Sequence, residues 1–266
     1  MKNDGKARAA GQVRSLTRAL NLLRHLAQSG DGMSLTELSE AAELPPSTTH
    51  RLLTTLESER FVRPDPAGGV WQIGVAAFIV GTAFARTRDK LSLSRPYLRR
   101  VMEMSGETAN LFVESDSEAV CICQIESRHA MRAITGVGGR VLLHSSGAGK
   151  ALLAHMEPAR RQRLISTMAL PRETQRTITD RARLEAELDE VRTLGYAVDD
   201  EEHALGLRCV AVPVLDEFGR AVAAISVSGP SARISVDRLP SLRRIISQAA
   251  REATRDYGGT PPIAAQ

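Results

Sequence analysis

Aromatic residues and cysteines are scarce in this sequence, and long apolar runs are missing. Aromatics make up 3% of the 266 residues, so the cores must be filled mainly by Leu, Ala, Val and Ile. No run of about 18 apolar residues occurs, which argues against a transmembrane helix. The opening stretch MKNDGKARAAGQ lacks the apolar centre of a secretion signal. We therefore expect a cytoplasmic protein with no membrane partner.

The three cysteines limit the possible chemistry. Cys121, Cys123 and Cys209 cannot form a disulfide framework, and a lone Cys-x-Cys supplies too few ligands for a structural zinc site. We expect reduced thiols, no metal and no bound cofactor. A thiol enzyme is the alternative from another class, and it would need an exposed thiolate beside a base. Cys121 and Cys123 are two apart and are expected on one face of a strand, and no histidine stands at a recognised catalytic spacing, so we expect no enzyme.

Length and composition indicate a globular protein of two domains. Apolar residues make up 42% and charged residues 25% of the chain, and the formal net charge of +4 permits nucleic-acid binding without establishing it. The predicted segments are a flexible arm over residues 1–11, a DNA-binding domain over 12–74, a linker helix over 75–90, an effector-binding domain over 91–258 and a flexible tail over 259–266.

The first half begins with two predicted helices. Apolar residues recur at helical spacing from residue 13 to residue 27, and Gly30 ends this helix. Ser34 and Glu37 form a capping box, which starts the second helix at Leu35.

A third helix and a hairpin follow. Pro45 and Pro46 suit a tight turn and the first turn of a helix over about residues 47–59. Strand-like segments at 61–63 and 70–73 flank a Pro- and Gly-rich tip and predict a hairpin. Three helices and a hairpin are the order of a winged helix-turn-helix.

The third helix has one apolar face and one polar face. Thr49, Leu53 and Leu56 lie on the face that must pack against the other helices. Short hydroxyls and an Arg on the opposite face suit contacts to phosphates and base edges. The plain alternative is a solvated face, but the capping box, the Pro-Pro turn and the hairpin favour DNA binding. The candidate DNA contacts are Ser47, Thr48, His50, Arg51, Thr54 and, on the hairpin, Arg63.

The second half mixes strands with helices, which predicts a separate α+β domain. Strands are expected at 109–114, 119–125, 131–134, 209–215 and 221–228, and helices at 93–105, from about 147, and at 158–167, 181–194 and 236–256.

Several blocks of the sequence resemble the IclR family of bacterial transcription regulators. LTELSEAAELPPSTTHRLLTTL (35–56) resembles the family's helix-turn-helix, and LLHSSGAGKALLA (142–154), GYAVDDEEHALGLRCVAVPV (195–214) and VAAISVSGPSARI (222–234) resemble its effector domain. The resemblance implies a winged helix-turn-helix, a linker helix and a GAF-like effector-binding domain. It also implies dimers paired into homotetramers, and double-stranded operator DNA as partner.

A small-residue block, Ser145 to Gly149, precedes a predicted helix. Open backbone N–H groups at a helix N-terminus suit a carboxylate, although a plain tight turn explains the block equally well. A phosphate-binding P-loop is excluded, because His144 and Ala151 occupy positions that need Gly and Ser or Thr.

Two serines stand on an apolar strand. Ser226 and Ser228 point to one face, where their hydroxyls need partners from the neighbouring backbone or from a ligand. The backbone is the commoner partner, and Cys209 is equally explained as a small buried residue.

Together these residues resemble the glyoxylate-responsive branch of the family, which includes repressors of allantoin catabolism. The branch's ligand residues match Gly147, Ala148, Asp199, Leu207, Cys209, Ser226 and Ser228. The resemblance implies a small carboxylate effector, a 2-oxo acid such as glyoxylate. Another short oxo acid or an aromatic acid is the alternative, although few aromatics are available to line a roomy pocket. A solvated or capping role is expected for Glu201 and Glu202.

Overall fold

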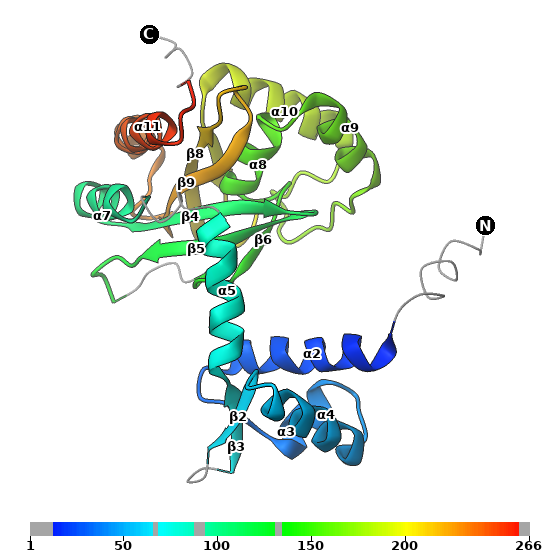
Figure 1. Cartoon of the computed structure of the whole chain (residues 1–266). Coiled ribbons are helices and arrows are strands. Elements are labelled where there is room, and N and C mark those ends of the chain that lie inside the picture. Colours follow the sequence, from blue (N-terminus) through cyan, green and yellow to red (C-terminus); the bar gives the residue numbers. More distant parts are fainter. Residues whose placement is uncertain (1–12, 66–68, 88–93, 131–134, 261–266) are drawn as a thin grey trace, which may run out of the picture. The chain divides into compact units, whose positions relative to one another are not determined.

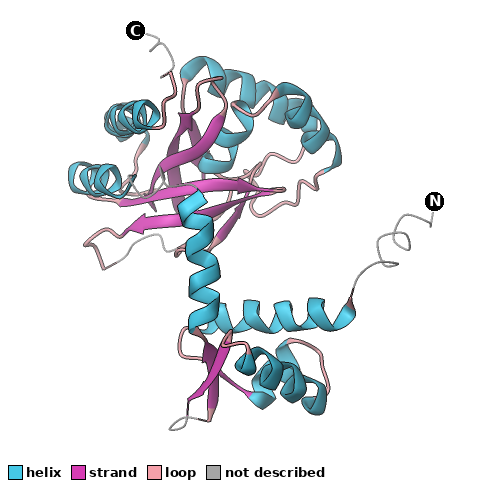
Figure 2. Ribbon diagram, in the orientation of Figure 1, coloured by secondary structure: helices cyan, strands magenta, loops and turns pink. Residues whose placement is uncertain are grey.

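The computed structural model describes residues 13–65, 69–87, 94–130 and 135–260, and the chain divides between residues 88 and 89 into two compact units (Figure 1, Figure 2). The predicted arm over 1–11, the predicted strand over 131–134 and the tail from 261 onwards lie outside the described residues. Each unit is described by itself.

The first unit contains the three predicted helices and the hairpin. The helices are α2 (Arg14–Ser29), α3 (Leu35–Ala41) and α4 (Pro46–Ser58), and the hairpin joins β2 (Val62–Asp65) to β3 (Val70–Ile73). The capping box is confirmed, since Ser34 Oγ accepts from the Glu37 N–H at 3.3 Å and the Ser34 N–H donates to Glu37 Oε2 at 2.8 Å. A short strand that was not predicted, β1 (Met33–Ser34), pairs with β3.

The helices enclose a small apolar core. Leu22, Leu38 and Leu53 are fully buried in it, one from each helix. This core also packs against the hairpin, and the packing fixes the orientation of α4 and therefore of its outer face. A further helix, α5 (Val75–Thr87), follows the hairpin, and none of the described helices has both the length and the apolar character that a membrane crossing requires.

The second unit is built on an antiparallel sheet of six described strands, in the order β6-β5-β4-β9-β8-β7. Two of them, β6 and β7, were not predicted. The strands are β4 (Thr108–Ser115), β5 (Glu118–Ile125), β6 (Arg140–Leu142), β7 (Ala197–Asp200), β8 (Leu207–Leu215) and β9 (Ala221–Pro230).

Helices cover both faces of this sheet (Figure 1). One face packs against α7 (Ser94–Ser105) and α11 (Leu239–Asp256), and the other against α8 (Gly147–Ala154) and α10 (Arg181–Leu194), with α9 (Pro158–Thr167) beside them. The prediction of a single last helix from residue 236 was wrong in its first turn, where Val236–Arg238 form a 3-10 helix instead.

The prediction that Cys121 and Cys123 share one face was also wrong. A bulge shifts the register between Leu111 and Phe112, so that Cys123 pairs with Leu111 while Cys121 pairs with Phe112. Cys121 therefore belongs to the core beneath α8, and Cys123 packs on the core beneath α7 and α11. One extra residue in a strand reverses the alternation on which such a prediction rests.

Candidate functional site

The outer face of α4 has the predicted polar composition. Ser47, His50, Arg51 and Thr54 are exposed and Thr48 is half-buried, whereas Thr49 on the inner face is fully buried. The side chains of His50 and Arg51 have no hydrogen bond or ion pair with other described residues, and they are therefore available to a partner.

The hairpin holds Arg63 in a defined place. Arg63 pairs with Gln72 across β2 and β3, and its Nη2 donates to Gln72 Oε1 at 2.6 Å. The side chain remains exposed. Helix face and hairpin together present the predicted basic and hydroxyl groups.

In the second unit, a cavity of about 30 Å³ lies between α8 and the sheet. It brings together six of the seven residues predicted to hold an effector: Ala148, Asp199, Leu207, Cys209, Ser226 and Ser228. The seventh, Gly147, lies directly beside it, since a Cβ on Gly147 would stand 3.2 Å from Cys209 Sγ. A side chain at this position would press on the thiol, so glycine keeps the space between α8 and the sheet free.

Strand pairing explains why residues so distant in sequence meet here. Asp199 of β7 lies opposite Cys209 of β8, and Cys209 lies opposite Ser228 of β9. Facing residues of neighbouring strands point to the same side of a sheet. The three side chains therefore form a row across the cavity.

Residues that were not predicted complete the lining. They are Asn110, Phe112, Thr135, Val141, Ser146 and His203. Asn110 is 1% exposed, and a buried amide on an apolar strand needs partners, so the argument applied to the two serines would have found it.

Asn110 belongs to a chain of hydrogen bonds across three strands. Gln124 Nε2 donates to Asn110 Oδ1 at 2.8 Å, and Asn110 Nδ2 donates to Ser228 Oγ at 3.0 Å and, at 3.5 Å, to Ser226 Oγ. Because Ser228 Oγ accepts this bond, its own hydrogen is left to donate to a ligand. Gln124 and Asn110 thus orient the serine pair.

Asp199 is the acidic group of the cavity. Its Oδ1 accepts from the backbone N–H groups of Glu202 at 2.8 Å and His203 at 3.2 Å. Burial nevertheless raises the pKa of its carboxyl to about 6. Asp199 is therefore mainly ionised at neutral pH, yet close to the range in which it takes up a proton.

The thiols are poorly suited to nucleophilic chemistry. Burial raises the pKa of Cys209 and of Cys121 to about 12, and it also raises the pKa of Cys123. A nucleophile or a metal ligand must be a thiolate. No cluster of metal-binding side chains occurs in the part of the chain that the structure describes.

A Ser, a Glu and a His also meet near the cavity without forming a catalytic triad. Ser145 Oγ donates to Glu173, and His203 Nδ1 lies 3.2 Å from both Glu173 carboxylate oxygens. The serine is bonded to the acid rather than to the imidazole, so no base is placed to activate it.

Comparison with known proteins identifies the family of this chain. Residues 15–66 match the IclR helix-turn-helix domain, and residues 83–255 match the bacterial transcriptional regulator IclR C-terminal domain. The chain belongs to the IclR family.

Full-length relatives support the assignment. The transcriptional repressor IclR of Escherichia coli strain K12 is 46% identical over 255 residues, covering 95% of this chain and 93% of that protein. The HTH-type transcriptional repressor AllR of the same strain is 40% identical over 256 residues, covering 96% and 94%. A solved IclR homologue from Microbacterium hydrocarbonoxydans, complexed with 4-hydroxybenzoate, shows the same fold with a TM-score of 0.80 at 23% identity, over 92% of this chain and 99% of that one.

These findings confirm the predicted family and fold class. This IclR-family chain is a DNA-binding transcriptional regulator with an N-terminal helix-turn-helix and a C-terminal α+β domain. The expectation that it is not an enzyme is confirmed by its regulator relatives.

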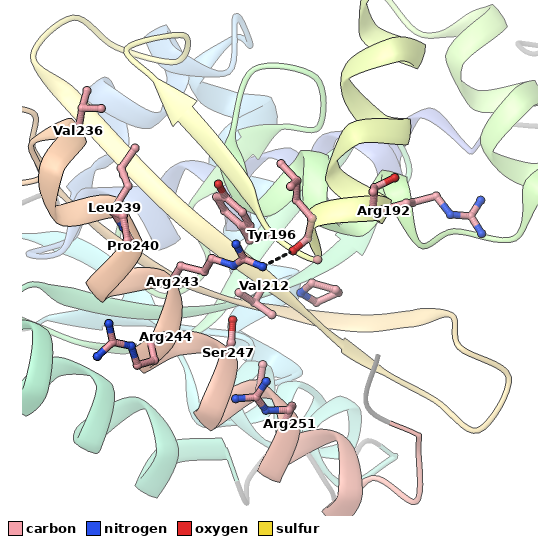
Figure 3. A pocket seen from close by; sticks show the side chains of 15 residues that line it. Arg192, Tyr196, Val212, Val236, Leu239, Pro240, Arg243, Arg244, Ser247 and Arg251 are labelled. Carbon is pink, nitrogen blue, oxygen red and sulfur yellow. Dashed lines mark hydrogen bonds between the residues drawn. The ribbon is translucent and has the colours of Figure 1, made fainter. Parts of the chain in front are cut away.

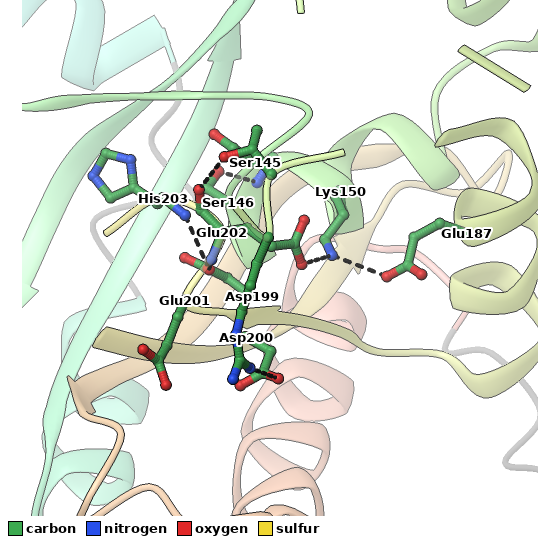
Figure 4. A network of polar contacts seen from close by, with 12 residues as sticks. Ser145, Ser146, Lys150, Glu187, Asp199, Asp200, Glu201, Glu202 and His203 are labelled. Atoms are coloured by element: carbon green, nitrogen blue, oxygen red, sulfur yellow. Dashed lines mark hydrogen bonds and ion pairs between the residues drawn. The ribbon is translucent and has the colours of Figure 1, made fainter. Parts of the chain in front are cut away.

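A buried ion cluster supports the cavity of this regulator (Figure 4). Lys150 of α8 is 0% exposed, and its Nζ lies 2.5 Å from Glu202 Oε1 and 2.9 Å from Glu187 Oε1. Burial alone would lower the pKa of Lys150, but the two carboxylates raise it. The expectation of a solvated or capping role for Glu202 is wrong, since it is buried and paired. Glu201 does cap locally, accepting from the Gly206 N–H at 2.9 Å.

Lys150→Met is expected to lower the free energy of unfolding by about 3–5 kcal/mol at pH 8, because it leaves the Glu202 carboxylate buried without a cation. In the parent protein burial raises the pKa of Glu202 to about 7 although Lys150 lowers it, and loss of Lys150 raises it further, so the folded variant binds the proton more tightly than the unfolded chain does. The loss should therefore shrink as the pH falls from 8.

Chemical unfolding of the full chain at fixed protein concentration measures this effect. The double variant Lys150→Met/Glu202→Gln is the control and should recover most of the loss, because neither charge remains. A single variant as stable as the parent at pH 8 would show that the cluster does not hold the unit together.

Proposed function

We propose that this regulator binds a pseudo-palindromic operator and that a small 2-oxo acid, with glyoxylate as first candidate, changes its operator affinity. The observation that carries the effector proposal is the small cavity of about 30 Å³, which gathers residues that match those of the glyoxylate-responsive branch. Because its partner would be operator DNA, we place the protein in the cytoplasm.

The size of the cavity favours a very small ligand. Pockets for drug-sized molecules usually measure about 300–1,000 Å³, roughly ten to thirty times more. Glyoxylate, a two-carbon acid, needs only slight opening, whereas a benzoate ring would require the strands and α8 to separate. An aromatic acid therefore stays the alternative, together with other short oxo acids. The 4-hydroxybenzoate homologue is too distant for its ligand to be transferred to this chain.

The polar groups match the chemistry of a hydrated oxo acid. The hydroxyl of Ser228, oriented by Asn110, donates to the carboxylate, and ionised Asp199 accepts from a hydroxyl of the aldehyde hydrate. The neutral Cys209 thiol packs beside the ligand. Overall identity does not select the effector, since the two relatives, IclR and AllR, are similarly distant.

Exposed apolar side chains on the DNA-binding unit support self-association. Val13 and Leu16 at the start of α2 are 63% and 59% exposed, and Phe78 on α5 is 70% exposed. Apolar surface of this kind favours contact with a second copy. We propose a homodimer, paired further into a homotetramer, in which the effector prefers one arrangement of the DNA-binding units. A preference of about 1–3 kcal/mol would change operator affinity about 5- to 150-fold.

Arg51→Ala is expected to weaken operator binding by about 1–3 kcal/mol, because a guanidinium on the outer face of α4 can grip a guanine edge. Fluorescence anisotropy of labelled operator DNA at several salt concentrations measures it. A loss that only flattens the salt dependence would assign Arg51 to phosphate. Unchanged binding would mean that α4 does not enter the DNA groove.

Glyoxylate at millimolar concentration is expected to shift the operator titration of the parent protein. The measurement uses DNA from upstream of the gene and its neighbours, with pyruvate, glycolate and 4-hydroxybenzoate as parallel additions. If DNA binding is saturable but none of these acids changes it, the proposal of operator binding stands and the proposal of a small-acid effector is wrong. A response to 4-hydroxybenzoate but not to glyoxylate would favour the alternative.

The affinity for glyoxylate is expected to fall about tenfold per pH unit below pH 6, because the ligand needs ionised Asp199, whose pKa is about 6 in the free protein. Asp199→Asn keeps an oxygen for the two backbone N–H groups, and it should bind weakly and without this pH dependence. Calorimetry between pH 5 and pH 8 measures both proteins. Tighter binding at low pH would mean that Asp199 donates a proton to the ligand instead.

A further inference from the structure

A second and larger hollow lies on the opposite face of the sheet from the effector cavity. It measures about 540 Å³ and runs between the end of α10, strand β8 and helix α11 (Figure 3). Val212 of β8 lines it, whereas Cys209 of the same strand lines the effector cavity. We call this hollow the α11 groove.

The α11 groove is strongly basic. Arg192, Arg243, Arg244 and Arg251 line it, and no Asp or Glu is among its lining residues. The side chains of three of the four, Arg192, Arg244 and Arg251, make no hydrogen bond or ion pair with any described residue. An uncompensated group of like charges raises the local concentration of anions.

Several arginines elsewhere in this unit are paired with carboxylates. Arg100 bonds Glu252, Arg160 bonds Glu114, and Arg220 bonds Asp216. Glu252 follows Arg251 directly on α11 and yet bonds Arg100 rather than its neighbour. The carboxylate next to Arg251 in the sequence is thus paired outside the α11 groove, and no acidic residue lines the groove to neutralise its positive charge.

The groove is also partly organised in advance. Arg243 Nη2 donates to the Leu194 carbonyl at 3.0 Å, and its guanidinium carbon lies 4.6 Å from the centre of the Tyr196 ring. Arg243, Ser247 and Arg251 follow one another at four-residue spacing on α11, so they line one side of the helix over about 12 Å. Figure 3 shows Arg243 crossing towards Tyr196, with Ser247 and Arg251 further along α11.

We propose that the α11 groove binds an organic polyanion, a phosphorylated or polycarboxylate metabolite, as a second ligand. Guanidinium groups grip phosphate and carboxylate through paired hydrogen bonds. Val212 and Leu239 supply an apolar wall for the carbon skeleton, and the volume is in the range of small-molecule sites. A second copy of the chain is a poorer occupant, because a two-fold contact through this groove would bring arginines against arginines.

Calorimetry of the full chain at fixed ionic strength tests the proposal with ADP, inorganic tripolyphosphate and citrate as probes, and with acetate as the monoanion control. We expect saturable binding of one molecule per chain for a phosphate probe, for citrate, or for both, and the pattern identifies the anionic group. Arg251→Gln should weaken this binding about tenfold or more, since a charge-assisted hydrogen bond is lost. Arg251 has no described partner, so the variant should fold.

Arg255→Gln removes one charge from the same helix outside the groove and should leave the affinity unchanged. The Arg51→Ala variant is a second control, because the DNA-binding face also attracts anions. It shows whether the probes bind there or in the α11 groove. Three results would overturn the proposal: no saturable binding of any polyanion, equal weakening by Arg251→Gln and Arg255→Gln, or binding lost in Arg51→Ala and retained in Arg251→Gln.

Discussion

A fully buried ammonium group is the constraint around which the second unit is built. Removing a charge such as that of Lys150 from water costs several kcal/mol unless carboxylates surround it. Glu187 of α10 and Glu202 of the loop after β7 supply them, so one cluster ties two helices to a loop. The same loop donates two backbone N–H groups to Asp199. The place of the cavity's carboxylate therefore depends on the buried lysine.

The two faces of the sheet offer contrasting environments to ligands. Beneath α8 the cavity is small, its thiol is neutral and its serines are oriented by Asn110, which suits holding a very small molecule rather than transforming it. Beside α11 the groove is wide and lined by arginines. Alternation along β8 separates the two environments, because neighbouring residues of a strand point to opposite faces. A single sheet can thus carry two independent sites.

Much of the architecture could be predicted because its signals are local. The capping box at Ser34 and Glu37 starts α3 where expected, and α9 and α10 have the predicted bounds. The outer face of α4 followed from helical periodicity. The short strands β6 and β7 were missed, since three or four residues carry too little pattern to be distinguished from loop.

The sequence by itself determined most of the helices, the family and six of the residues that line the cavity beneath α8, because caps, periodicity and motifs are properties of neighbouring residues. Only the tertiary structure decided which side chains meet. Cross-strand register brought Asp199, Cys209 and Ser228 into a row, and a single bulge placed Cys121 and Cys123 on opposite faces. The partners of Lys150 and the unpaired arginines of the α11 groove likewise depend on the packing of distant segments, and short-range patterns do not encode that packing.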